Sequence, residues 1–76
     1  MTKMMYFIGS DLRVGKETVD EVSRLKGCSK VYSAFSGGVL PANGYVAEFN
    51  ITDLNDALRV KEELSKIKGV ERLTLL

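Results

Sequence analysis

The sequence contains no histidine and no tryptophan, and only one cysteine (Cys28) and one proline among its 76 residues. Without histidine the chain lacks the commonest general base and the commonest transition-metal ligand. A lone cysteine forms no intramolecular disulfide and persists best in a reducing compartment, so we expect a cytoplasmic protein. We expect no metal and no other cofactor. We also expect no enzyme activity, because no pair of residues meets the demands of acid–base or nucleophilic catalysis.

An excess of charge of one sign and long apolar runs are absent as well. The 11 basic and 10 acidic residues leave a formal charge of +1, which gives no general attraction to nucleic acid. The longest apolar run, residues 4–8, is far shorter than the roughly 20 residues that a membrane-spanning helix needs. We therefore expect neither direct nucleic-acid binding nor a membrane association.

What the sequence does contain is an alternation of strand and helix patterns. Strand-forming residues predict strands at 4–10, 28–36, 45–51 and 70–76. Apolar residues at helical spacing predict a helix over 16–26 and a second one that begins after Thr52 or Asp53 and ends at Gly69. No segment has the composition of a linker, so residues 1–76 should form one domain. The buried face predicted for the second helix consists of Leu54, Ala57, Leu58, Leu64 and Ile67.

The two halves of the chain resemble each other. Arg24-Leu25-Lys26-Gly27 and Lys66-Ile67-Lys68-Gly69 lie 42 positions apart (66 minus 24), and each closes a predicted helix before a predicted strand. This repeat supports two β-α-β units. We therefore predict an α+β, ferredoxin-like βαββαβ sandwich, with a four-stranded antiparallel sheet and two helices on one face.

The first strand is apolar on both of its faces. If Met4, Tyr6 and Ile8 point toward the helices, Met5 and Phe7 point to the open face of the sheet. Together with Val46, they predict an exposed apolar patch, and such patches usually mark interfaces. Met5, Phe7 and Val46 are therefore our candidate interface residues for a homo-oligomer, a dimer or higher. The alternative is a small sheet that tolerates some exposed apolar side chains.

The segment between the second and third predicted strands is the candidate ligand site. It follows a strand and leads to a strand, so it is not a phosphate-binding loop, which needs a helix N-terminus. Adjacent glycines can still offer backbone N–H groups to a small carboxylate or amide ligand, with serine and asparagine side chains beside them. The alternative is a turn that needs positive φ. The candidate ligand-binding residues are Ser36, Gly37, Gly38, Asn43 and Gly44.

Short motifs along nearly the whole chain carry a family resemblance. They are Val14-Gly15-Lys16-Glu17, Val31-Tyr32-Ser33, Ser36-Gly37-Gly38, Asp53-Leu54 and Ile67-Lys68-Gly69-Val70-Glu71-Arg72. In these motifs the chain resembles a stand-alone form of the ligand-binding (RAM) domain of Lrp/AsnC-type transcription regulators. The resemblance implies βαββαβ dimers that assemble further and that sense amino acids between subunits, near Gly37 and Gly38. This chain departs from the family there, with a longer connection through Pro41 to Asn43-Gly44.

The expected function is therefore that of a homo-oligomeric regulatory domain that binds a small metabolite, with amino acids as the class that the resemblance implies. No helix-turn-helix precedes residue 4, so we do not expect direct DNA binding. Two alternatives stay open. One is a structural protein–protein interaction module, and the other is an ACT-like regulatory domain, which shares the fold and senses amino acids.

Overall fold

The structure, a computed structural model, describes residues 2–35, 40 and 42–76. Within these residues the chain is α+β, with a four-stranded antiparallel sheet and two helices. The elements, in chain order, are β1 (Thr2–Ser10), α1 (Lys16–Ser23), β2 (Cys28–Ala34), β3 (Gly44–Ile51), α2 (Leu54–Lys66) and β4 (Thr74–Leu75).

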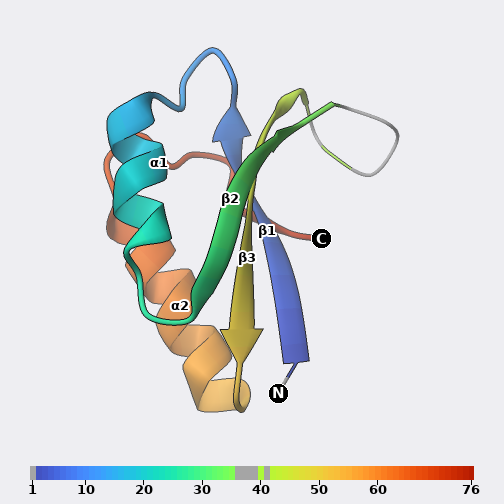
Figure 1. The fold of residues 1–76 in the computed structure, drawn as a ribbon, viewed down its shortest axis with the longest axis vertical. Helices are drawn as coiled ribbons and strands as arrows, with labels where there is room; N and C mark the ends of the chain where they lie inside the picture. Colours follow the sequence, from blue (N-terminus) through green and yellow to red (C-terminus); the bar gives the residue numbers. More distant parts are fainter. Residues whose placement is uncertain (1, 36–39, 41) are drawn as a thin grey trace.

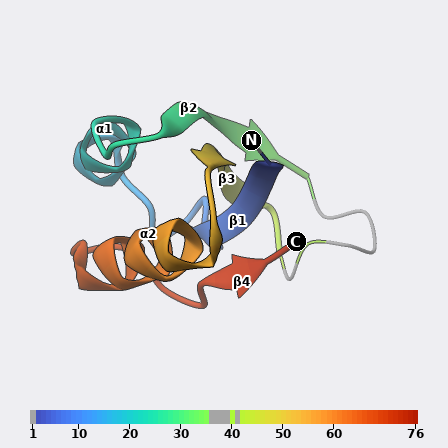
Figure 2. The ribbon, with the colours of Figure 1, turned by 90° about the horizontal axis from the view of Figure 1, so that it is seen from below.

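The strands lie in the order β2-β3-β1-β4, so β1 and β3 form the centre of the sheet. Each neighbouring pair is antiparallel. Figures 1 and 2 show both helices on the same face of the sheet, with α1 beside β2 and α2 beside β1 and β4. This arrangement is compatible with the ferredoxin-like fold that the sequence predicts.

The core lies between the helices and one face of the two central strands. As the alternation in β1 predicts, Tyr6 and Ile8 point into this core, and the rings of Tyr6 and Phe49 pack edge to face with 6.1 Å between ring centres. Edge-to-face packing of this kind adds to the gain from burial. The buried residues of the core are Tyr6, Ile8, Val14, Val22, Ala47, Phe49, Ile51, Val60 and Leu64.

The repeated motifs end in equivalent turns. Gly27 and Gly69 have φ values of 90° and 100°, in the left-handed region that glycine adopts most easily. The Cys28 amide donates to the Leu25 carbonyl at 3.1 Å, and the Val70 amide donates to the Ile67 carbonyl at 3.2 Å. The two halves of the chain therefore repeat in their backbone hydrogen bonds as well as in their sequence.

Several of the predicted elements are shorter than expected: β2 ends at Ala34 and α2 at Lys66, before the predicted ends at residue 36 and Gly69. The first helix ends at Ser23 instead of residue 26, because the Arg24 and Leu25 amides donate to carbonyls three residues back, which tightens the last turn. The last strand covers only Thr74–Leu75 instead of 70–76. Its first half is lost because Arg72 has a φ of 53°, which no extended strand accommodates.

The buried face predicted for α2 is partly wrong. Leu54 and Leu58 are exposed, with 73% and 57% of their surface accessible, whereas Val60 and Leu64 are fully buried. The helix is therefore turned so that Val60 replaces the two leucines against the sheet. Two large apolar side chains remain at the edge of the molecule.

The exposed patch predicted for the open sheet face is also largely wrong. Phe7 is 0% and Val46 is 2% exposed, and only Met5, at 39%, offers accessible surface. Val46 lies between the two strands that carry Phe7 and Tyr32, its cross-strand neighbours. The Phe7 ring lies beside Gly44, where no side chain competes for space. Packing along the sheet surface thus buries residues that no helix covers.

Candidate functional site

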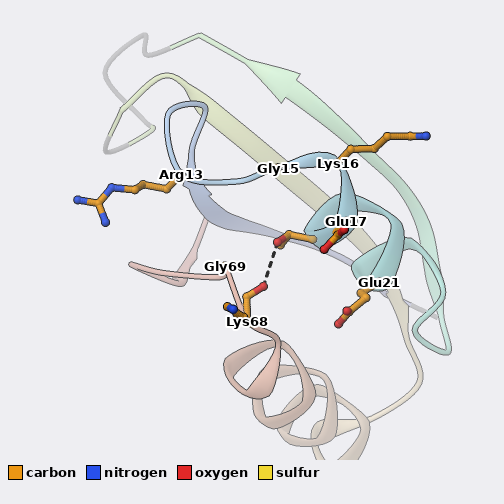
Figure 3. A pocket seen from close by; sticks show the side chains of 8 residues that line it. Arg13, Gly15, Lys16, Glu17, Glu21, Lys68 and Gly69 are labelled. Atoms are coloured by element: carbon orange, nitrogen blue, oxygen red, sulfur yellow. Dashed lines mark hydrogen bonds between the residues drawn. The ribbon is translucent and has the colours of Figure 1, made fainter.

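A pocket of about 440 Å³ opens at the N-terminus of α1 (Figure 3). Three segments form it: the connection from β1 to α1, the first turns of α1, and the turn that follows α2. Its lining residues are Arg13, Gly15, Lys16, Glu17, Thr18, Glu21, Lys68 and Gly69.

The helix end in this pocket has no side-chain cap. The Arg13 and Val14 amides both donate to the Ser10 carbonyl, at 3.0 and 2.9 Å, and this turn buries Val14 and places Gly15 at the N-cap. Gly15 has a φ of −94°, and a Cβ built there would meet nothing within 4 Å. The N-terminus of α1 thus has no capping side chain, and the helix dipole favours a negative group there.

The pocket is bounded by a close crossing of α1 and the turn after α2. The Thr18 hydroxyl (Oγ1) donates to the Lys68 carbonyl at 2.9 Å, as the dashed line in Figure 3 marks. Gly69 lies against the same hydroxyl, so a Cβ at this position would collide with Thr18. This contact fixes the position of Lys68 relative to the helix end.

The lining residues carry charges of both signs. Arg13 approaches Glu71 at 3.7 Å (Nη1 to Oε2), whereas Lys16 and Lys68 form no ion pair with another residue of the described ranges. In Figure 3 the Arg13 and Lys16 side chains extend to opposite sides, and Glu17 and Glu21 follow Lys16 along α1. A small ligand with one negative and one positive group finds complementary partners here: the helix N-terminus and carboxylates.

Of the predicted ligand residues that the structure describes, neither Asn43 nor Gly44 lines this pocket. Ser36, Gly37 and Gly38 lie outside the described residues. The Asn43 carbonyl accepts a hydrogen bond from the Asp11 amide at 3.0 Å, which links the β2–β3 connection to the β1–α1 connection. Asn43 thus lies at the same end of the sheet as the β1–α1 connection, which contributes Arg13 to the pocket.

Gly44 has a packing role that the sequence did not reveal. It is buried, and a Cβ there would collide with the Gly9 carbonyl and lie 2.9 Å from Cε1 of Phe7. Close approach of the central strands therefore requires glycine at this position. Its role in ligand binding, like that of Asn43, stays a prediction.

The single thiol is poorly suited to nucleophilic chemistry. Burial raises the pKa of Cys28, and a backbone hydrogen bond at Lys30 offsets this rise only partly. A raised pKa keeps the thiol protonated, and the thiolate is the nucleophilic form. Cys28 also packs against the hydrophobic core, which agrees with the role of a small apolar residue.

Among the described residues, no three carboxylate or thiol side chains lie close enough together to hold a metal ion. Within the same ranges, neither helix has the length and the apolar character needed to span a bilayer. Comparison of the chain with protein-family models, with curated proteins and with solved structures finds no match.

Sequence reasoning did not single out the pocket as a site. Val14-Gly15-Lys16-Glu17 entered only as part of a family resemblance. The local signal for this pocket was Gly15, which directly precedes a helix with Glu17 and Glu21 in its first turns. The contribution of Lys68 had no such signal, because its carbonyl meets Thr18 across 50 positions of the chain.

Proposed function

We propose that this chain is a non-catalytic domain with the ferredoxin-like fold that binds a small zwitterionic ligand, of the amino-acid class, and acts as a homo-oligomer in the cytoplasm. In this respect it would work as the effector domain of an Lrp/AsnC-type regulator works. The observation that carries the proposal is the uncapped N-terminus of α1, inside a pocket that also presents carboxylates and lysines.

An amino acid matches both features of the pocket. Its carboxylate can accept hydrogen bonds from the N–H groups that follow Gly15, with Lys68 nearby to balance its charge. Its ammonium group can pair with Glu17 or Glu21. The volume of about 440 Å³ lies within the range of about 300–1,000 Å³ that is typical of small-molecule sites.

Thermal unfolding of the full chain with each free amino acid tests this proposal. We expect at least one amino acid to raise the melting temperature, because a ligand that binds only the folded state stabilises it. The Gly15→Asp variant should abolish this shift, since its own carboxylate would occupy the N–H groups of the first turn.

Gly15→Ala is the matched control, because it adds a Cβ in the same open space without a carboxylate. It should keep the ligand-induced shift. If Gly15→Asp responds to the ligand as the parent does, while replacement of Gly37 and Gly38 by leucine removes the response, the site lies in the β2–β3 connection. If no amino acid shifts the parent, the ligand-binding function is wrong.

A second candidate function is that of a structural interaction module. The exposed leucines of α2 favour it, because large apolar side chains with more than half of their surface accessible stand together at one edge of the molecule. An interaction module should show no thermal shift with amino acids.

A further inference from the structure

An apolar groove of about 280 Å³ runs between α2 and the edge of the sheet. Leu54, Leu58 and Leu75 line it, and they are 73%, 57% and 56% exposed. Met4 and Ala57 lie deeper in the same groove. Adjoining apolar side chains with this much accessible surface are costly to leave in water.

Within the described residues, the strand beside this groove has a free edge on one side. On its β4 side, β1 pairs only at Tyr6 and Phe7, and the Leu76 amide donates to the Met5 carbonyl at 2.9 Å. Backbone groups of a strand alternate between its two sides, so the N–H and C=O of Lys3 face the same side as those of Met5. No residue of the described ranges pairs with Lys3 on that side.

The free edge and the groove lie at the same end of the molecule. Thr2 pairs with Ile51, the last residue of β3, and α2 begins three positions later at Leu54 (54 minus 51). A second hollow, of about 340 Å³, is lined by Thr2, Met4 and Leu54 and joins the two features. We call the free side of Thr2–Met4 together with Leu54, Leu58 and Leu75 the β1 edge surface.

We propose that two copies of this chain associate through the β1 edge surface. The free side of β1 would pair antiparallel with the same strand of the second copy, and Leu54 and Leu58 would pack against the same two leucines. This inference deepens the homo-oligomer of the proposed function and rests on that part of it. In this arrangement the interface between copies does not include Phe7 and Val46, two of the interface residues predicted from the sequence, because they have almost no accessible surface.

The geometry points to a second copy because the surface is self-complementary. A two-fold axis perpendicular to the sheet makes β1 antiparallel to itself and keeps all helices on one face. It also brings α2 of the two copies side by side, because α2 lies beside β1 and β4 (Figure 2). In this arrangement the backbone N–H groups of β1 face carbonyl groups of the second copy, and the exposed leucines of α2 face the same leucines of the second copy.

The charges that flank the leucines fit the same symmetry. Asp53 lies at one end of the stretch, in the hollow beside β1, and Lys61 lies at the other end, in the groove. A two-fold axis near Ala57, midway between positions 53 and 61, places Asp53 of each copy opposite Lys61 of the other. Opposite charges at the rim fix the register of an interface.

The Lys3 side chain leaves the edge accessible. Its Nζ lies 3.6 Å from Oε1 of Glu48, a buried carboxylate on the open face of the sheet. Glu48 is also held by Lys30, with 3.4 Å between Nζ and Oε2. The Lys3 side chain is thus directed over its own sheet, and its backbone groups remain available to another strand.

Sedimentation equilibrium of the full chain tests the proposal. The parent should have a mass near twice 8.4 kDa. Leu54→Glu/Leu58→Glu should raise the dissociation constant by about tenfold or more, because carboxylates would be buried in an apolar contact. Leu12→Glu is the matched control: Leu12 is 91% exposed and lies in the β1–α1 connection, away from the surface.

Lys3→Pro tests the strand pairing separately. Proline removes the outward N–H of Lys3 and should weaken the dimer, whereas Lys3→Ala keeps that N–H and should leave it intact. Circular dichroism of each variant must match the parent. A folded Lys3→Pro variant that dimerises as Lys3→Ala does would overturn the pairing of β1 with itself.

An exchange of charges identifies the partner as a second copy. Lys61→Glu and Asp53→Lys should each weaken self-association, because each places like charges opposite each other. Their mixture should form a heterodimer, in which both contacts again join opposite charges. A parent that sediments as a monomer overturns both this interface and the proposed homo-oligomer. A dimer that the leucine variants leave intact overturns this interface alone.

Discussion

Thr18 and Lys68 join the two halves of the molecule through one hydrogen bond, from the Thr18 hydroxyl to the Lys68 carbonyl at 2.9 Å. Thr18 is 8% exposed, so its hydroxyl does not exchange this bond easily for water. The bond holds the N-terminal turn of α1 against the turn after α2, and it thereby shapes the candidate pocket.

Loss of this hydroxyl should destabilise the fold. Thr18→Val keeps the shape of the side chain but leaves the Lys68 carbonyl without its donor. We expect the free energy of unfolding to fall by about 0.5–1.5 kcal/mol, the net contribution of a typical hydrogen bond, because Lys68 is an exposed residue. Urea unfolding measures it. Thr18→Ser keeps the donor and should cost less; an equal loss in both variants would show that the methyl group, not the hydroxyl, matters.

Replacement by alanine should lower the melting temperature by different amounts at Gly27 and Gly69, the equivalent glycines of the two repeated motifs. Both have positive φ, so both variants carry backbone strain of about 1 kcal/mol or more. At Gly69 the new Cβ also collides with Thr18, whereas at Gly27 the nearest atom, the Asn50 carbonyl oxygen, is 3.1 Å away. Gly69→Ala should therefore have the lower melting temperature. Equal melting temperatures would contradict the crossing seen at Thr18.

Acid should weaken the start of α2 through Asp56. Hydrogen bonds from the Thr52 amide and from Arg59 lower the pKa of Asp56 below its ordinary value of 3.8. A group with a lowered folded-state pKa stabilises the fold above its unfolded pKa and loses that effect as pH falls through the folded value. The stability difference between the parent and Asp56→Asn should therefore shrink below pH 3.8, as thermal unfolding across pH would show. A constant difference would contradict the pKa shift.

Local sequence patterns predicted the main features of the fold. Alternation in β1 placed Tyr6 and Ile8 on the helix side, and Asp53 was one of two candidate caps for the second helix. The structure confirms the Asp53 cap, whose Oδ1 accepts from the Asp56 amide at 2.8 Å. These features depend on residues close in sequence, which is why the sequence alone was sufficient.

Features that depend on distant residues were not predictable in this way. Leu54 and Leu58 belong to the apolar stripe of α2 by spacing, yet the docking angle of the helix exposes them and buries Val60, beside the correctly predicted Leu64. Only the assembled sheet decides that angle. The candidate pocket likewise needs Lys68 to meet α1, and no periodicity within either segment reports such a contact.

The burial of Phe7 leads to the last prediction, which separates packing within one chain from packing between copies. Phe7 is fully buried in the single chain although it points away from the helices. Phe7→Ala should therefore cost about 3–5 kcal/mol, as truncation of a buried phenylalanine does. This cost should be the same at every protein concentration, because no second copy is needed to cover the ring.

Chemical unfolding over a series of protein concentrations measures both the cost of Phe7→Ala and its dependence on concentration. Met5→Ala, which truncates a partly exposed neighbour, is the control. If the cost of Phe7→Ala grows with protein concentration while the Lys3→Pro variant still dimerises, then the open face of the sheet, and not the edge of β1, joins the subunits.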